Sequence, residues 1–203
     1  LFTLLFGQGG LALAMATGIL IIPNAFRDGV RHILDFQWDI VQRQTVTVSL
    51  VEPGPLRAAH DFAQLPGVIH TEPFRTVAIE MSAGHQSRRL ALHGVVDQGD
   101  LNRVIGRDGR PFSVRGRGLI ISEALGETLG IQPGDTVAIR VLQGKRREVS
   151  LRVGGFSQDF AGIASFMDLD ALNRILGEGD QISGAFMSVA GGEWETFLRT
   201  LKE

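Results

Sequence analysis

An uncharged apolar stretch opens the chain. Residues 1–26 contain no ionisable side chain, and the first charge is Arg27. As an α-helix this stretch would rise about 39 Å, whereas the hydrocarbon core of a bilayer is about 30 Å thick. The pattern predicts that Leu1–Ile22 crosses a membrane. Three small residues, each four apart, give this helix a face suited to close packing on other helices: Gly10, Ala14 and Gly18.

Two other interpretations of this stretch remain open. A buried core helix would show a polar face, and a cleaved signal peptide would begin with a basic region. The stretch has neither feature, although Ala12-Leu13-Ala14 resembles a cleavage site. Because the chain begins inside the apolar stretch, we expect it to be a piece of a longer polytopic membrane protein.

A second helix is predicted after Pro23, because proline ends or kinks the first one. Apolar residues recur at three- and four-residue spacing among charged residues as far as Val41. We interpret residues 24–42 as a stalk leaving the membrane, so that residues 1–42 form a transmembrane helix and stalk.

Beyond the stalk, β-branched alternation and turn residues predict short strands and helices. The first group comprises a strand at Thr45–Val51, a turn at Glu52–Pro55, a helix at Leu56–Leu65, a strand at Val68–Met81 bent at Glu72-Pro73, a loop at Ser82–Ser87 and a strand at Arg88–Val96.

The polar, turn-rich run Gly99–Pro111 is the best internal boundary in the sequence. After it the same reasoning predicts strands at Gly118–Ile121, Thr136–Leu142, Arg147–Phe156 and Ile182–Val189, and helices at Glu123–Leu129, from Asp168 or Asp170 to Leu176, and at Glu193–Leu201. Ser122 is a predicted N-cap, and Gly130 and Gly177 are predicted helix ends.

The outer pieces of the chain complement each other as the parts of a split βαβ unit. We therefore predict an α+β fold, with a porter-like lobe formed by residues 43–98 and 180–203. Residues 99–179 would form an inserted β-rich lobe. In this arrangement the final strand of the α+β lobe lies beyond Glu203, beside Thr45–Val51 or its neighbours.

Composition narrows the class of protein. The 203 residues carry a net charge of −2, which argues against a nucleic-acid surface, since phosphate binding needs clustered Lys and Arg. The apolar content of 44% is enough for a real core, and the 26 glycines favour many short elements. The chain has no cysteine, which removes disulfides, thiolate catalysis and zinc–cysteine sites.

The sequence contains no persuasive catalytic, cofactor or metal-binding constellation. There is no G-x-S-x-G, no phosphate-binding P-loop and no complete G-x-G-x-x-G motif. His70 and His93 fall in predicted strands, where a hydrogen-bonded structural role outweighs metal ligation. Asp168 and Asp170 could hold a cation, but helix capping explains them better, and Asp135 is most simply a turn residue.

Two surface features have both a structural and a functional interpretation. The basic clusters Arg88-Arg89 and Lys145-Arg146-Arg147 fit a solvated hairpin, or contact with anionic lipid headgroups. Four apolar residues around a glycine-rich loop fit packing under the adjacent helix, or an exposed patch for a partner or lipid: Phe156, Phe160, Phe166 and Met167.

Four stretches of the chain, in order, carry a pattern that points to a family. They are LFTLLFGQGGLALA at the start, Leu65-Pro66-Gly67-Val68 with Glu72-Pro73-Phe74-Arg75, Gly118–Leu125 with Leu129-Gly130 and Pro133–Val137, and Phe166–Asn173. Together they resemble the FtsX-like and MacB-type permeases of ABC transporters. The resemblance covers nearly the whole chain, although no single motif is decisive.

This resemblance implies a domain on the periplasmic, extracytoplasmic side of the cytoplasmic (inner) membrane, between two transmembrane helices. It implies a separate cytoplasmic ATP-binding subunit, a second permease copy in a dimer, and a lipoprotein, lipid, peptide or periplasmic partner outside the membrane. It places no catalytic residue in the domain, so no site residue is carried over and the chain is not expected to be an enzyme. The alternative is a membrane-anchored ligand-binding, adaptor or sensor domain without an ATPase, and a membrane-tethered hydrolase is the weakest hypothesis.

Overall fold

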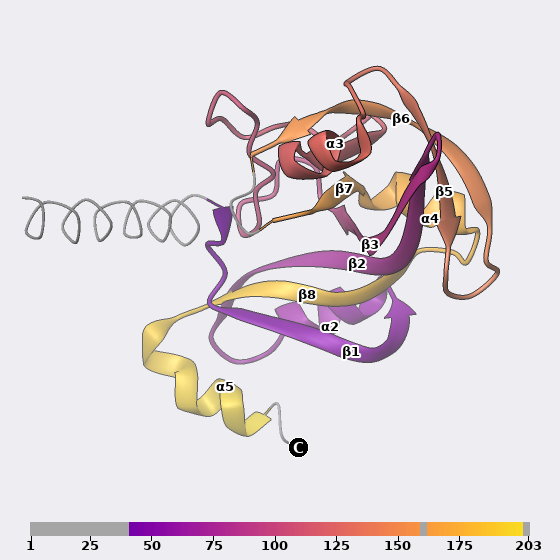
Figure 1. Ribbon diagram of the computed structural model, residues 1–203. Helices are drawn as coiled ribbons and strands as arrows, with labels where there is room; N and C mark the ends of the chain where they lie inside the picture. The colour runs from indigo at the N-terminus through magenta and orange to yellow at the C-terminus, as the bar shows by residue number, and fades with distance from the viewer. Residues whose placement is uncertain (1–40, 159–161, 201–203) are drawn as a thin grey trace, which may run out of the picture. The chain divides into compact units, whose positions relative to one another are not determined.

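The computed structural model describes residues 41–158 and 162–200 (Figure 1). The predicted membrane span Leu1–Ile22 and the stalk up to Ile40 lie outside the described residues. From Val41 onward the chain belongs to one compact unit. In the part of the chain that is described, no helix combines the length and apolar character needed to cross a bilayer.

The described elements are strands with short helices between some of them (Figure 1). Their order is β1 (Val46–Pro55), α2 (Arg57–Ala63), β2 (Val68–Ala83), β3 (Gln86–Val95), β4 (Leu119–Ser122), α3 (Glu123–Leu129), β5 (Thr136–Val141), β6 (Glu148–Ser157), β7 (Ser165–Asp168), α4 (Leu169–Leu176), β8 (Gln181–Val189), the 3-10 turn η2 (Gly191–Glu193) and α5 (Trp194–Thr200). The mixed α/β class is confirmed. Strand β7 was not predicted, because four residues are too few to show alternation.

One lobe, here called the α+β lobe, contains β1, α2, the first half of β2, β8 and α5. Its strands lie in the order β1-β8-β2 and all pair antiparallel. Apolar side chains of β8 and of both helices share one core cluster, in which Met187 and Phe197 are fully buried. Both helices therefore cover the same face of this sheet, as the predicted split βαβ unit requires.

The second lobe, here called the ring lobe, contains the second half of β2, strands β3 to β7, and the helices α3 and α4. Its strands follow the order β2-β3-β7-β4-β6-β5, and β5 then pairs again with β2, so the sheet closes on itself. The largest core cluster of the described residues fills this ring, with Ile79, Leu119 and Leu125 completely buried. Closure removes the free strand edges of this lobe.

Strand β2 belongs to both lobes. Its first half pairs with β8 as far as Phe74, and its second half pairs with β3 from Arg75 onward. The ring lobe therefore uses β3 and half of β2, both of which the sequence pattern assigns to the α+β lobe. The division into residues 43–98, 99–179 and 180–203 stays a prediction, but strand pairing shows that residues 99–179 do not close the ring alone.

Two predicted turns are different in the structure. The run Glu52–Pro55 is part of β1, which bulges between Ser49 and Gly54 against β8. The bulge lets an edge strand carry two prolines, and it leaves Val51 fully exposed. The predicted loop Ser82–Ser87 is instead a tight hairpin, since Ala83 pairs with Gln86 and Gly84 takes a positive φ of 58°.

The run Gly99–Pro111 is not a solvated linker. Leu101, Val104 and Ile105 are each less than 10% exposed. The carboxylate of Glu72 accepts the backbone N–H groups of Asp100 and Leu101, which holds this run against β2. The polar composition of the run hid its few apolar anchors, so this run is packed against the fold, while the lobe boundary placed here stays a prediction.

Candidate functional site

The junction between the two lobes is built around Arg75, on the strand that crosses from one lobe to the other. Arg75 is 3% exposed and occupies the first position of β2 that pairs with β3. Its neighbour Phe74 makes the last pair with β8, opposite Gly184. A buried cation therefore marks the point where β2 changes partners.

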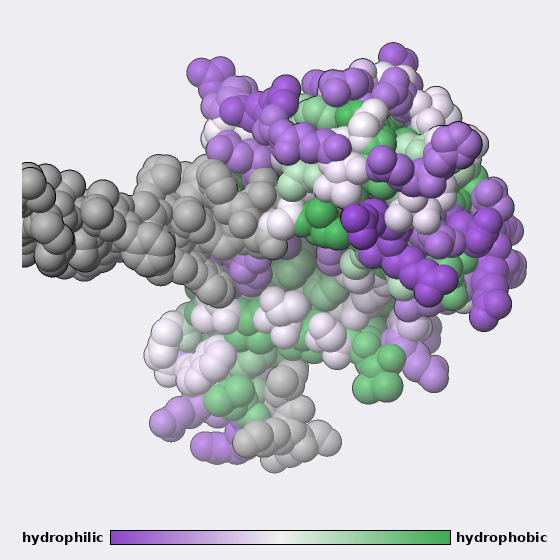
Figure 2. All heavy atoms as spheres, viewed as in Figure 1, coloured by the Kyte–Doolittle hydropathy of each residue, from purple (hydrophilic) through white to green (hydrophobic). Residues whose placement is uncertain are grey.

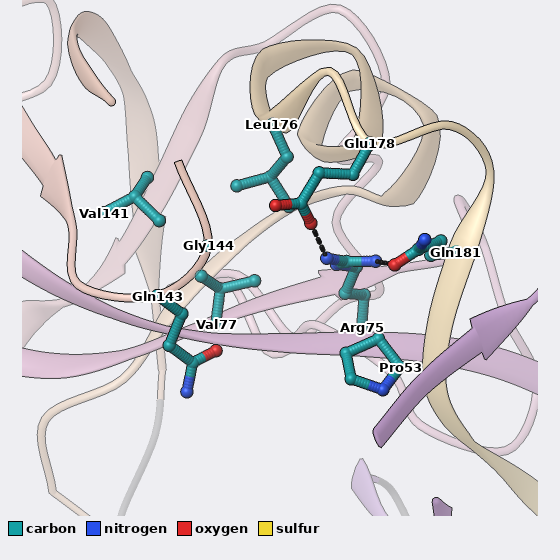
Figure 3. Close-up of a pocket in the computed structure, with 9 residues that line it drawn as sticks. All are labelled: Pro53, Arg75, Val77, Val141, Gln143, Gly144, Leu176, Glu178 and Gln181. Atoms are coloured by element: carbon teal, nitrogen blue, oxygen red, sulfur yellow. Dashed lines mark hydrogen bonds and ion pairs between the residues drawn. The ribbon is translucent and has the colours of Figure 1, made fainter. Parts of the chain in front are cut away.

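The guanidinium of Arg75 connects this point on β2 to a second place where the chain passes between the two lobes. Its Nη2 donates to Glu178 Oε2 at 2.6 Å, and its Nη1 donates to Gln181 Oε1 at 3.0 Å (Figure 3). Glu178 lies in the connection from α4 to β8, and Gln181 begins β8. The planar fork of arginine suits two such acceptors, so one side chain links both chain crossings.

A cavity of about 500 Å³ opens beside this ion pair. Its lining residues come from both lobes (Figure 3): Pro53, Arg75, Val77, Val141, Gln143, Gly144, Leu176, Glu178 and Gln181. The bulge of β1 supplies Pro53, and the connection between β5 and β6 supplies Gln143 and Gly144. A change in the angle between the lobes would therefore change the shape of this cavity.

The connection between β5 and β6 holds the end of α4 in place. Lys145 Nζ donates to the carbonyl of Gly177 at 3.4 Å, and Arg147 Nη1 donates to the carbonyl of Ile175 at 3.1 Å. Cations at a helix C-terminus complement its unpaired carbonyls. Two side chains of the basic cluster Lys145–Arg147 thus bind carbonyl groups at the C-terminal end of α4. These contacts position Glu178, which follows α4, beside Arg75.

The cavity offers binding rather than covalent chemistry. Its ionisable lining groups are Arg75 and Glu178, which neutralise each other, and the lining contains no hydroxyl or thiol. The Nε of Arg75 is buried without a hydrogen-bond partner among the described residues. A buried ion pair of this kind fixes geometry, and breaking it by removing one partner is costly.

Sequence reasoning missed these residues. Arg75 ends the quoted motif Glu72–Arg75, but nothing in the motif says what the cation contacts. The available signal was a charged residue in a strand that is otherwise apolar at alternate positions. Its partner Glu178 lies 103 positions away, beyond the reach of any local pattern.

The two strand histidines have hydrogen-bonded structural roles, as predicted. The Nε2 atom of His70 lies 3.0 Å from Glu72 Oε1, and Nδ1 of His93 lies 3.1 Å from the hydroxyl of Thr76. Within residues 41–158 and 162–200, no group of three or more His, Cys, Asp or Glu side chains is arranged to hold a metal ion.

The aspartates have the local roles that the sequence indicated. Asp168 is the N-cap of α4 and accepts the N–H of Ala171 at 3.0 Å, while Asp170 lies in the first turn. Asp135 accepts the N–H of Gln132 at 2.8 Å within its turn.

The apolar residues around the glycine-rich loop and the basic pair on β3 are the remaining surface features predicted from the sequence. Met167 and Phe156 are buried in the largest core cluster, and the partly buried Phe166 packs against a second, smaller one, so the packing interpretation holds for these three. Phe160 lies outside the described residues. Arg88 and Arg89 remain exposed on β3, where Arg89 Nε lies 3.7 Å from Glu80.

Comparisons with solved structures show which class of protein domain has this fold. No protein-family model and no curated protein sequence matches the chain. Among solved structures, the extracellular domain of the noncanonic ABC-type transporter YknZ from Gram-positive bacteria is similar, with a TM-score of 0.54 at 15% identity, covering 71% of this chain and 78% of that one. The periplasmic region of MacB from Actinobacillus actinomycetemcomitans has a TM-score of 0.52 at 15% identity, covering 76% and 74%.

The described domain therefore has the fold of the extracytoplasmic domains of ABC-transporter permeases. The resemblance drawn from the four sequence stretches is confirmed at the level of the fold. At this identity the neighbours establish the architecture, and no residue role is taken from them.

Proposed function

We propose that this chain is the extracytoplasmic part of an ABC-transporter permease, anchored in the inner membrane by Leu1–Ile22. The observation that supports it best is the two-lobed topology in which β2 runs through both sheets, in a fold that is similar to the YknZ and MacB domains. In this role a cytoplasmic ATP-binding subunit drives motion that the domain uses outside the membrane. Its cargo would be a lipoprotein, lipid, peptide or partner protein.

The proposed role is mechanical and needs no catalytic residue in the domain. Motion would enter through residues 24–42 and reach the lobe junction, where Arg75 links the two chain crossings. A transmitting element must have two arrangements whose balance the ATPase cycle can shift. The junction suits this role because one ion pair and a cavity lie between the lobes.

The first test is the composition of the complex. The permease is purified from native membranes through a tag on this subunit, and co-purifying proteins are identified. We expect a stoichiometric ATP-binding subunit and a second permease copy. Purification of the intact protein with no ATP-binding partner would contradict the proposal.

The second test addresses the stalk. Ile33→Pro in the complete permease should uncouple ATP-driven function while leaving ATP hydrolysis by the partner subunit measurable. The lobes should keep their thermal unfolding midpoint, because the substitution lies outside them. Full coupled function in the Ile33→Pro permease would refute the mechanical role.

A ligand-binding or adaptor domain without an ATPase is the second candidate function, and the junction cavity of about 500 Å³ is the observation that favours it. This candidate predicts a small molecule that purifies with the chain at one equivalent. Native mass spectrometry of the chain distinguishes the two proposals, since the mechanical role requires no resident ligand.

A further inference from the structure

The connection between β3 and β4 carries an unusual concentration of arginine. Residues 103–117 include one carboxylate, Asp108, and five arginines: Arg103, Arg107, Arg110, Arg115 and Arg117. The whole chain is slightly acidic, with a net charge of −2, so this segment is a local reversal of sign. Figure 2, viewed as in Figure 1, shows that hydrophilic side chains gather over the ring lobe.

Three of these arginines are neutralised within the fold. Arg103 bonds Asp100 at 2.6 Å, Arg107 bonds Glu123, and Arg115 lies 4.0 Å from Asp168. Among the described residues, Arg110 and Arg117 form no salt bridge, and neither does Arg152 on β6. Uncompensated positive charge therefore remains at Arg110 within the segment, at Arg117 at its end, and at Arg152 on the neighbouring strand.

Arg117 and Arg152 line one crevice of about 550 Å³. Its lining comes from three places, namely residues 116–118, residues 133–134 and residues 152–154. The two guanidinium groups are the only charged groups of this lining. The nearest acid in sequence, Asp135, is engaged with the backbone N–H of Gln132 at 2.8 Å.

Glycine makes the crevice possible. A Cβ on Gly154 would lie 1.9 Å from the carbonyl oxygen of Arg117, and one on Gly118 would lie 2.5 Å from that of Arg152. Both distances are too short for any side chain, so the two backbone segments approach in a way that only glycine allows. The crevice is preformed by the backbone.

The side chain of Arg117 is also oriented by its surroundings. The guanidinium of Arg117 lies over the ring of Phe112, 4.6 Å from its centroid. An aromatic face attracts the cation and limits its freedom while leaving its N–H edge available. The guanidinium of Arg152 reaches Gly134, since its Nη2 would lie 3.8 Å from a Cβ added there.

We propose that this crevice, which we call the arginine crevice, binds a phosphate group between Arg117 and Arg152. Two guanidinium forks match the oxygens of a phosphate, and the absence of a competing carboxylate in the lining leaves them free to do so. The phosphate could belong to an anionic lipid headgroup or be a free phosphate ion. The phosphate-binding proposal depends only on the described residues of the crevice. It can therefore be refuted while the proposed permease function stands, and the proposed function can be refuted while the phosphate site stands.

The test is titration of the purified 1–203 chain, in non-ionic detergent at low salt, with two probes. One probe is inorganic phosphate and the other is short-chain phosphatidylglycerol, with sodium chloride of equal ionic strength as the blank. Amide signals of the crevice glycines report binding by NMR. We expect a saturable shift that weakens as salt is raised, because exposed charges are screened.

Three variants make the test specific. R117A/R152A should weaken binding about tenfold or more, through loss of both charge-assisted forks. R117K/R152K should give an intermediate loss, since lysine keeps the charge but not the fork. R88A/R89A removes the same charge from another exposed part of the ring lobe and should bind as the unmodified chain does.

Each outcome has a meaning. Tighter binding of phosphatidylglycerol identifies a lipid headgroup as the source, and equal binding of both probes identifies the phosphate ion. No saturable shift with either probe overturns the proposal. An equal loss in R88A/R89A and R117A/R152A also overturns it, because the effect would then be one of net charge alone.

Discussion

At the scale of single residues, Gly184 shows how closely β1 and β8 approach. Gly184 lies opposite Ser49, and a Cβ added to it would be 2.1 Å from the carbonyl oxygen of Val48. The same Cβ would lie 2.9 Å from the ring of Phe74. Neither backbone nor a stacked ring can yield cheaply, so the contact demands glycine.

Gly184→Ala should therefore destabilise the fold by about 1–3 kcal/mol through overpacking. The measurement is urea unfolding followed by circular dichroism. Gly191→Ala is the matched control, because a Cβ there meets nothing within 4 Å. Equal stability of the two variants would show that β1 can move away from β8 without cost.

Asp97 gives the domain a predicted dependence on pH. Burial alone would raise the pKa of its carboxyl, but hydrogen bonds from Ser113 and from the N–H groups of Arg115 and Val114 outweigh burial and lower that pKa. A carboxyl whose pKa is lowered by folding stabilises the protein above the unfolded pKa of about 3.9, and this stability is lost as the pH falls through the folded pKa.

Asp97→Asn should thus be less stable than the unmodified chain at pH 7, and the difference should shrink as the pH falls below about 4. Urea unfolding between pH 7 and pH 3 measures it. Asp61→Asn, on α2, removes a carboxylate without these hydrogen bonds and serves as the control. A difference that stays constant over this range would contradict the assigned role of Asp97.

At the scale of elements, Ser122 both begins α3 and ties it to the loop before β7. Its Oγ accepts the N–H of Leu125 at 3.4 Å and that of Ala164 at 3.0 Å. The first bond is a local N-cap, and the second joins parts of the chain 42 positions apart. Ser122 is completely buried, so neither donor would find water in its place.

Ser122→Ala should cost more than the roughly 1 kcal/mol of an ordinary N-cap, because a second buried N–H loses its acceptor. Thr128→Ala on the exposed side of the same helix is the control and should change stability little. Thermal unfolding of both variants measures the loss of stability that each substitution causes. A cost for Ser122→Ala no larger than that of Thr128→Ala would show that the cap and the loop contact are dispensable.

At the scale of the whole domain, the Arg75–Glu178 pair links the two places where the chain passes between lobes. The side chain of Arg75 is 4% exposed and that of Glu178 is 24% exposed. Removing the arginine would leave a carboxylate that is only partly solvated. Removing both charges together would leave neither group uncompensated.

Arg75→Ala should destabilise the domain, but by less than the about 3–5 kcal/mol of a fully buried pair, because Glu178 keeps some contact with water. The variant with both Arg75→Met and Glu178→Gln should recover part of the loss. Urea unfolding of Arg75→Met, Glu178→Gln and the variant with both completes a double-mutant cycle. Purely additive losses would mean that the pair does not couple the two crossings.

Local signals in the sequence were sufficient for much of the fold. The serine and glycine that bound α3 act on backbone groups within four residues, so Ser122 and Gly130 could be assigned without tertiary information. Alternation in β1, β2 and β8 likewise reports which positions face a core. These effects depend on a few consecutive residues, and they gave the α+β class and most elements.

Only the tertiary structure decided which strands pair and where the lobes meet. Alternation indicates that β2 is half-buried, but it does not say that β8 covers one part and β3 and β5 another. The fork of Arg75 and the arginine crevice both join segments distant in sequence, and packing of the whole core brings these together. The uncharged stretch at the start of the chain, by contrast, follows from composition alone, because the absence of charge over residues 1–26 needs no fold to be recognised.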